Sequence, residues 1–290
     1  MIKWYRSRIL RKLIKFGYWG VALRQCSDDY LFNSEGQKSE YQIISNTEYY
    51  WFADPILYED NNKTWLFVEA FNLEKNRGEI GVFDIVNGNA VNFRVIIKES
   101  FHMSFPLVFD IDGKKYMIPE TGENNSVILY EAIEFPDKWK IQKKLLEGDQ
   151  YRDSTLFSIN GEYYLYTYVR TDHSKLFHTY KCEVYKFNKS EKTLSKIQEY
   201  DDTSANRRSA GPVICDNNKT IYVTQKCDKC YGEAIEFWDA SNGPTSLKNL
   251  NPYKIVFGEN INIKNVGNPL IIHTYSKSSM YEVIDYKVRK

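Results

Sequence analysis

The sequence predicts an all-β protein, a five-bladed β-propeller preceded by a short N-terminal amphipathic helix. Two observations lead to this fold. First, one pattern occurs four times: a β-rich run, a short turn and a second β-rich run. Its copies are 51, 48 and 58 residues apart, counted between Pro55, Pro106, Ser154 and Pro212. Second, no long amphipathic helical pattern follows residue 16. A β-sandwich is the alternative, but it does not predict a period of about 50 residues.

Each copy reads as a β-hairpin. The turns are rich in Asn, Asp and Gly, which accept positive φ at little cost, and they lie at Asp60–Lys63, Asp112–Lys115, Asn160–Glu162 and Asp216–Lys219. Further strand-like runs bring each unit to about four strands, the content of one propeller blade. Four blades are expected to begin near residues 51, 102, 152 and 209. Residues 254–286 would form a fifth, shorter blade, completed by a strand from residues 18–24.

Composition excludes several classes of protein. Hydrophobic residues make up 42% and aromatic residues 16%, which excludes disorder for most of the chain. No apolar run approaches the ~18 residues of a membrane-spanning helix. A net charge of +1 argues against nucleic acid as the main partner. The five cysteines are scattered and no secretory signal is evident, which indicates reduced thiols in a cytoplasm.

The charge is concentrated at the N-terminus. Residues 1–24 carry +7 without any acid, leaving −6 for residues 25–290. Basic side chains recur at helical spacing, at Arg8, Arg11, Lys12 and Lys15. This pattern predicts a helix able to lie on an anionic membrane, or alternatively a solvated helix packed on the propeller. We therefore divide the chain into a basic segment, residues 1–17, and one propeller domain, residues 18–290.

Candidate catalytic residues follow from the topology of a propeller. The first strand of each blade lines the central channel, and the second strand returns to the same rim. Asp54 and Asp153 begin first strands, and Glu120 ends a second strand. Glycosyl chemistry uses a pair of carboxylates about a sugar ring, so these three acids are the predicted catalytic residues. The alternative is that the aspartates only accept hydrogen bonds from backbone amides of the strand.

Other polar and aromatic residues are expected at the same rim. Arg207 and Arg208 would bind a phosphate or carboxylate, or form a solvated loop. The remaining substrate-binding candidates are Trp51, Glu69, His102, Gln225, Tyr231 and His273. We expect no metal and no cofactor. Asp110 and Asp112 resemble a metal-binding DxD motif but fall in a hairpin turn, and no second Cys/His pair accompanies Cys227 and Cys230.

Several motifs occur in an order that resembles a known family. They are Trp51-x-Ala-Asp54-Pro55, Phe67-Val-Glu69, His102-x-Ser104-Phe-Pro106, Pro119-Glu120-Thr121, Asp153-x-Thr155, Arg208-x-Ala210-Gly211 and Gln225-x-Cys227 with Tyr231-Gly232. Together they resemble the N-terminal domain of glucosamine inositolphosphorylceramide transferases and its stand-alone bacterial relatives, over residues 18–286. The resemblance implies a five-bladed propeller akin to arabinanases, invertases and levansucrases, with an acidic triad. Asp54 and Asp153 match two of its acids, although Ser154 replaces the usual proline, whereas the acid of those hydrolases comes from a later blade than Glu120.

The plant relatives' transferase domain is a separate C-terminal one, and the bacterial relatives resemble parts of capsule or lipopolysaccharide synthesis. We therefore expect a cytoplasmic glycosyltransferase, peripheral on the inner face of the cytoplasmic membrane. It would move a sugar from a nucleotide sugar to a lipid-linked glycan. Asp54 would be the base, Asp153 would stabilise developing positive charge, and Arg207 and Arg208 would bind the departing diphosphate. A glycoside hydrolase using Asp54 and Glu120 and a non-catalytic glycan-binding propeller are the alternatives.

Overall fold

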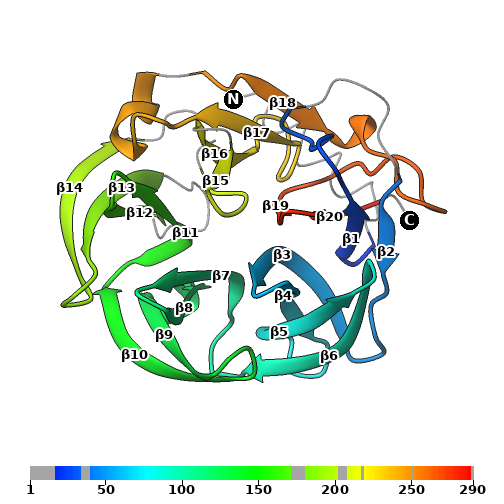
Figure 1. Cartoon of the computed structure of the whole chain (residues 1–290), viewed down its shortest axis with the longest axis horizontal. Helices are drawn as coiled ribbons and strands as arrows, with labels where there is room; N and C mark the ends of the chain where they lie inside the picture. Colours follow the sequence, from blue (N-terminus) through cyan, green and yellow to red (C-terminus); the bar gives the residue numbers. More distant parts are fainter. Residues whose placement is uncertain are drawn as a thin grey trace.

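The computed structural model describes residues 17–33, 40–170, 180–201, 208–216, 219–249 and 251–288. Five four-stranded antiparallel sheets radiate around a common axis, as Figure 1 shows, so the predicted five-bladed propeller is confirmed. The predicted N-terminal helix falls on residues that lie outside this description. The helical elements of the described residues are 3-10 helices, η1 (Gly122–Asn124), η2 (Pro244–Asn249) and η3 (Gly258–Asn260).

In each of the first three blades the four strands follow the order of the sequence from the axis outward. Blade one contains β3 (Tyr50–Asp60), β4 (Lys63–Asn72), β5 (Arg77–Val86) and β6 (Asn89–Ile97). Blade two contains β7 (Ser104–Ile111), β8 (Lys114–Thr121), β9 (Ser126–Glu134) and β10 (Lys138–Glu147). Blade three contains β11 (Gln150–Ile159), β12 (Glu162–Arg170), β13 (Tyr180–Asn188) and β14 (Thr193–Asp201). Positive φ at Asn61, Asp112 and Asn160 confirms the predicted hairpin turns.

The last two blades share the remaining strands differently from the prediction. Blade four contains β15 (Ile214–Asp216), β16 (Lys219–Lys226), β17 (Ala234–Asp239) and β18 (Lys254–Phe257). Blade five contains β19 (Tyr275–Lys277), β20 (Tyr281–Tyr286), β1 (Gly20–Gln25) and β2 (Gln42–Ile44). The assignment of Lys254–Phe257 to blade five was therefore wrong. Those residues complete the outer edge of blade four by pairing with β17, and blade five instead takes two strands from the N-terminal part.

The ring closes between the two ends of the chain. β1 pairs with β20 in an antiparallel register from Gly20–Tyr286 to Gln25–Tyr281, which confirms the expected contribution of the N-terminal strand. A buried ion pair joins the same two strands, with Arg24 Nε donating to Glu282 Oε1 at 2.6 Å. The hydroxyl groups of Tyr41 and Tyr275 also donate to Glu282. These contacts compensate the cost of burying both charges.

Apolar side chains fill the spaces between adjacent blades. The main buried clusters each combine residues of two neighbouring blades, such as Phe67 and Met117 between blades one and two, or Phe157 and Tyr222 between blades three and four. Neighbouring blades therefore cover each sheet on both faces. This burial explains why the strands are rich in apolar residues. No helix among the described residues has the length and apolar character needed to cross a bilayer.

Three innermost strands contain the same irregularity. Asp54, Phe105 and Asp153 have φ of 47°, 45° and 40°, and the ladder slips by a residue or more at each position. Such β-bulges redirect a side chain and leave a backbone amide unpaired in the sheet. The bulges therefore occupy equivalent places in blades one, two and three, near the propeller axis.

Candidate active site

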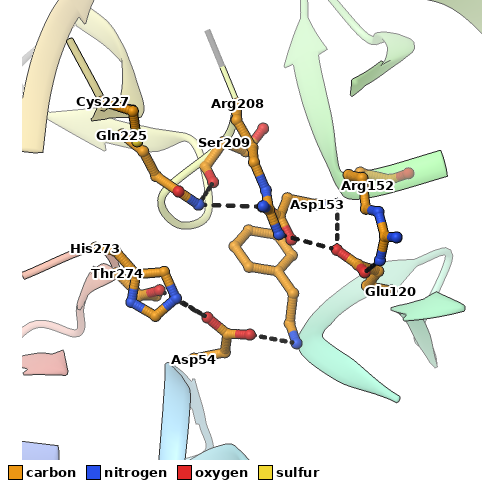
Figure 2. A network of polar contacts seen from close by, with 12 residues as sticks. Asp54, Glu120, Arg152, Asp153, Arg208, Ser209, Gln225, Cys227, His273 and Thr274 are labelled. Atoms are coloured by element: carbon orange, nitrogen blue, oxygen red, sulfur yellow. Dashed lines mark hydrogen bonds and ion pairs between the residues drawn. The ribbon is translucent and has the colours of Figure 1, made fainter. Parts of the chain in front are cut away.

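Asp54, at the bulge of β3, forms a buried chain of charged groups with His273 and Asp285. Asp54 Oδ1 lies 3.1 Å from His273 Nε2, and His273 Nδ1 lies 2.7 Å from Asp285 Oδ2. Thr274 donates its hydroxyl to Asp54 Oδ1 at 2.9 Å (Figure 2). Asp285 also accepts the backbone amides of His273, at 3.1 Å, and Thr274, at 2.9 Å. The imidazole is therefore held between two carboxylates in a fixed orientation.

These contacts set the protonation states of Asp54 and His273. Burial alone would raise the pKa of Asp54, but the charge of His273 and hydrogen bonds from His273 and Thr274 lower it to about 2. Burial would lower the pKa of His273, but Asp285 and Asp54 raise it to about 10. At neutral pH the chain therefore contains an ionised Asp54 beside an imidazolium.

A second group, on blades two, three and four, contains two acids and two arginines. Arg208 donates from Nε to Asp153 Oδ2 and, at 3.3 Å, from Nη2 to Glu120 Oε2. Arg152 donates to Glu120 Oε1. Gln225 Nε2 donates to Asp153 Oδ2 at 3.1 Å, and all these groups meet in Figure 2. About a quarter of each arginine side chain is exposed.

The two acids of this group have opposite protonation preferences. Burial would raise the pKa of Glu120, but Arg152 and Arg208 lower it to about 2. Burial raises the pKa of Asp153 well above its ordinary range; Arg208 acts against this rise, whereas the charge of Glu120 adds to it. Glu120 therefore stays ionised at neutral pH, and Asp153 tends to keep its proton. Arg208 also contributes to the low pKa of Asp54, which places the two groups in electrostatic reach of each other.

The same carboxylates bind the backbone of the bulges. Asp285 accepts the amide of Asp54 at 3.0 Å, Asp54 accepts that of Phe105 at 3.2 Å, and Glu120 accepts that of Asp153 at 3.3 Å. In each case a carboxylate of one blade accepts a hydrogen bond from a backbone amide of the next blade that is unpaired within its own sheet. The structural role that the sequence offered as an alternative for Asp54 is therefore present, and it links blades rather than one strand to itself.

Three buried side-chain oxygens in this region have no hydrogen-bond partner among the described residues. They are Glu69 Oε1, Asp153 Oδ1 and Gln225 Oε1. Because an unsatisfied buried polar atom is costly, such atoms suit a ligand with hydroxyl groups, which both donate and accept hydrogen bonds. A sugar presents such groups on several carbon atoms. Glu69 lies at the same rim, with Oε1 3.5 Å from His102 Nε2, and burial together with the Asp54 charge raises its pKa well above the ordinary range.

Aromatic side chains border the His273 side of the site. Trp19 stacks on the imidazole of His273, with ring centroids 4.2 Å apart and planes inclined by 26°. Tyr231 lies 5.2 Å from the same ring, and Arg208 lies 5.7 Å from the centroid of Tyr231. Trp51 stacks on Phe71 at 4.4 Å. These rings border the charged groups and pack against His273 and one another.

The structure brings most of the predicted residues together. Asp54, Glu120, Asp153, Arg208, Gln225, Tyr231 and His273 are linked by the contacts above, with Glu69, His102 and Trp51 at the edge. Arg207 lies outside the described residues. His273 precedes β19 (Tyr275–Lys277) in an irregular segment.

Sequence reasoning missed four residues of the site. Arg152 is adjacent to a predicted acid but was not assigned a role, and Trp19 lies within the strand predicted for residues 18–24. Thr274 and Asp285 bind Asp54 from blade five. Asp285 carried one usable signal, because it is a charged residue within the otherwise buried strand β20. The other three residues reach the site through the packing of neighbouring blades, which the sequence pattern does not show.

One group of described residues has the composition of a metal site. The ligand atoms of Asp54, His273 and Asp285 lie within 4.8 Å of one another. A metal would require a neutral imidazole, whereas the two acids favour the imidazolium. Asp110, from the DxD-like sequence, accepts the amide of Gly113 and the ammonium of Lys115, as a turn residue does. Cys227 Sγ accepts the backbone amide of Gly232 at 3.5 Å.

Comparison with known proteins identifies related sequences. Residues 39–254 match the family described as glucosamine inositolphosphorylceramide transferase 1, N-terminal. Glucosamine inositolphosphorylceramide transferase 1 of Arabidopsis thaliana is 34% identical over 124 residues, covering 42% of this chain and 16% of the plant protein. The protein of the same name from Oryza sativa subsp. japonica is 26% identical over 193 residues, covering 64% of this chain and 26% of the plant protein. The chain thus spans about a quarter or less of these relatives.

Solved structures with the same fold include glycoside hydrolases. A GH43_1 enzyme from Xanthomonas citri complexed with xylotriose has a TM-score of 0.58 and 11% identity, covering 83% of this chain and 87% of the enzyme. A thermostable family-43 glycoside hydrolase has a TM-score of 0.55 and 14% identity, covering 84% and 91%. At these identities the likeness concerns the fold.

Proposed function

Because the chain belongs to the glucosamine inositolphosphorylceramide transferase N-terminal family, we propose that it is a glycosyltransferase whose site lies at the propeller axis. The donor is a nucleotide sugar and the acceptor a lipid-linked glycan of capsule or lipopolysaccharide assembly. The reaction takes place at the cytoplasmic face of the cytoplasmic membrane. The observation that carries this proposal is the combination of an ionised Asp54 with two partly exposed arginines, Arg152 and Arg208.

Each group has a role in transfer. The acceptor hydroxyl attacks the anomeric carbon and gives its proton to Asp54, whose Oδ2 accepts only the Phe105 amide among the contacts described. The bond between the anomeric carbon and the phosphate oxygen breaks, and its electron pair leaves with the diphosphate. Arg208, with Arg152, stabilises that negative charge by charge-assisted hydrogen bonds. Gln225 accepts a hydroxyl group of the sugar through its unsatisfied Oε1, and the protonated Asp153 hydrogen-bonds another hydroxyl group through Oδ1.

The protonation state of Glu120 argues against a hydrolase that uses Asp54 and Glu120. A hydrolase that used Asp54 and Glu120 would need one of them to protonate the leaving oxygen. The arginines hold Glu120 ionised, with a pKa of about 2, so it is a poor proton donor. A nucleoside diphosphate leaves as a stable anion and needs no such proton. The position in blade four that corresponds to Asp54 and Asp153 contains Ala210 and Gly211, so that blade supplies no further acid there.

The substitution Asp54→Asn tests the proposal, with Asp112→Asn in an exposed hairpin turn as control. A thermal-shift screen with nucleotide sugars first identifies a donor, since ligand binding raises the melting temperature. Asp54→Asn should then lower turnover roughly 10²–10⁴-fold, the usual contribution of a general base. Donor affinity should change little, because the loss falls on the transition state.

The same measurements distinguish the alternatives. Full turnover in a folded Asp54→Asn protein would refute the role of this residue as a base. Release of free sugar from aryl glycosides by the wild type, without transfer to any acceptor, would favour a hydrolase. Glycan binding without turnover from any donor would favour a binding module.

A further inference from the structure

The loop between β16 and β17 contains two cysteines that the proposed reaction does not use. β16 ends at Lys226 and β17 begins at Ala234. Cys227 and Cys230 lie in the loop between them, both half-buried and neither in a disulfide. The backbone bends at each residue from 228 to 230. Because the ends of a four-residue turn lie within about 7 Å of each other and a disulfide spans about 4.4–6.8 Å between Cα atoms, this spacing suits an intramolecular disulfide.

The sulfur of Cys227 takes part in holding the loop in its conformation. Gly232 donates its backbone amide to Cys227 Sγ at 3.5 Å, and such a hydrogen bond favours the thiolate, the form of cysteine that reacts with peroxides. The carbonyl of Gly232 accepts the amide of Ile272 at 3.0 Å. A Cβ atom on Gly232 would lie 2.5 Å from Ile271, so the loop packs closely on the segment before β19. Cys227 therefore contacts the residue that joins the loop to blade five.

Tyr231 connects the same loop to the candidate active site. Its ring centroid lies 5.2 Å from that of His273, and Arg208 Cζ lies 5.7 Å from the Tyr231 centroid. Figure 2 shows Cys227 beside Gln225 at the edge of the polar network. Arg208 is the guanidinium proposed to bind the departing diphosphate. A rearrangement of the loop would therefore move a ring that packs against two groups of the site.

A metal site is the other common use of two cysteines at this spacing. In the part of the chain that the structure describes, no third His, Cys or acidic side chain places a ligand atom close enough to both sulfurs to complete such a site. The chain also offers a single thiol for comparison. Cys215 is exposed and pairs with Thr220, at the other end of β16 from Cys227.

We propose that Cys227 and Cys230 form an oxidation site, at which hydrogen peroxide produces a disulfide that weakens donor binding. The thiolate of Cys227 attacks one peroxide oxygen, the O–O bond breaks, and hydroxide leaves with its electron pair. The thiolate of Cys230 then attacks the sulfur of the resulting sulfenic acid, the S–O bond breaks, and a second hydroxide leaves. The protons of the two thiols convert both hydroxides to water. The two sulfur atoms together lose two electrons, and the peroxide gains them.

The disulfide changes the loop because it alters the acceptor of the Gly232 amide. The bridged sulfur is a poorer acceptor than a thiolate, and Cys227 must turn toward Cys230. Gly232 and the adjacent Tyr231 then lose the position that packs Tyr231 on Arg208. The effect on donor binding rests on the proposed function, whereas formation of the disulfide does not.

Peroxide treatment of the reduced full-length protein, followed by peptide mass spectrometry, tests the chemistry. The wild type and Cys215→Ser should both form a Cys227–Cys230 cross-link that dithiothreitol reverses. Cys230→Ser should stop at the sulfenic acid of Cys227, which dimedone should trap roughly tenfold faster than that of Cys215. Absence of the cross-link, or equal trapping at Cys215 and Cys227, would overturn the proposal.

Two measurements on the oxidised protein test the consequence. Affinity for a nucleotide sugar should fall about tenfold on oxidation of the wild type and stay unchanged in the double variant Cys227→Ser, Cys230→Ser, since the loss comes from a less preorganised site. Equal affinity of the oxidised and reduced wild type would overturn the proposal.

Hydrogen exchange gives a second reading that needs no donor. The amide of Ile272 should exchange faster in the oxidised wild type, because its bond to Gly232 is disturbed, and unchanged exchange would overturn the proposal. A reduced wild type that binds no nucleotide sugar would contradict the proposed function, and the exchange measurement would then decide whether the disulfide changes the loop.

Discussion

The charge of His273 gives the protein a pH-dependent stability that can be measured. The folded state holds the imidazole proton up to a pKa of about 10, whereas the unfolded state loses it near the ordinary value of 6.5. The contribution of this proton to stability is therefore complete below pH 6.5 and is lost as the pH rises toward 10. Within this window the free energy of unfolding should fall by up to about 1.4 kcal/mol per pH unit.

The clearest interval is pH 7 to about 8.5, where the expected loss is roughly 2 kcal/mol. At higher pH Cys26 acts in the same direction, because burial raises its pKa to about 12. Urea unfolding at several pH values gives the free energy in wild type, in His273→Gln and in His102→Gln. The His273 variant should be less stable and should have a shallower pH dependence in this interval, because it loses the contribution of the imidazole while Asp153 and Glu69, whose pKa values are also raised, still act in the same direction. The His102 variant should keep the wild-type slope, because it leaves the contacts of His273 with Asp54 and Asp285 in place.

Parallel curves for wild type and His273→Gln would refute the reasoning. An NMR titration that placed the imidazole pKa of His273 near 6.5 in the folded protein would refute it as well. Either result would mean that Asp54 is not held ionised by a neighbouring imidazolium, and the protonation states assigned to the site would have to be revised.

Two further predictions concern arginines. Arg24→Met should lower the free energy of unfolding by about 3–5 kcal/mol in urea, because it leaves Glu282 buried without its cation where β1 closes the ring, whereas an unchanged midpoint would contradict that role. Arg208→Lys should weaken nucleotide-sugar binding about tenfold in a titration, since a lysine does not reproduce the forked contacts of a guanidinium, and wild-type affinity would exclude Arg208 from donor binding.

The fold could be predicted because its determinants are local and repeated. The hairpin turns at Asn61, Asp112 and Asn160 require residues that tolerate positive φ, and the sequence places such residues at the same point of three repeats. The division between blades four and five could not be predicted. β18 follows β17 after an irregular segment that contains η2, and no local sequence signal indicates which sheet β18 joins. β18 joins blade four because β17 has an edge there with which it can pair.

The site could be predicted in part for the same reason. Asp54 and Asp153 occupy equivalent places in their repeats, so the pattern identified both. Arg152 and Asp285 act across blade boundaries, and their partners are distant in sequence: Arg152 binds Glu120, and Asp285 binds Asp54 and His273. The protonation states also depend on this three-dimensional arrangement, because burial alone would raise the pKa of Asp54, Glu120 and Asp153 alike.

The same carboxylate groups of the site therefore have a structural function and a proposed catalytic function. Asp54 Oδ2 accepts the Phe105 amide of the next blade, and Glu120 Oε2 accepts the Asp153 amide. These bonds hold the bulges in place, and the bulges in turn aim Asp54 and Asp153 at the axis. A bond of this kind gives each carboxylate one fixed rotamer before any substrate binds, which is the preorganisation that transition-state stabilisation requires. It also follows that the propeller ring and the site form together, because the residues that join the blades are the residues proposed to act on the sugar.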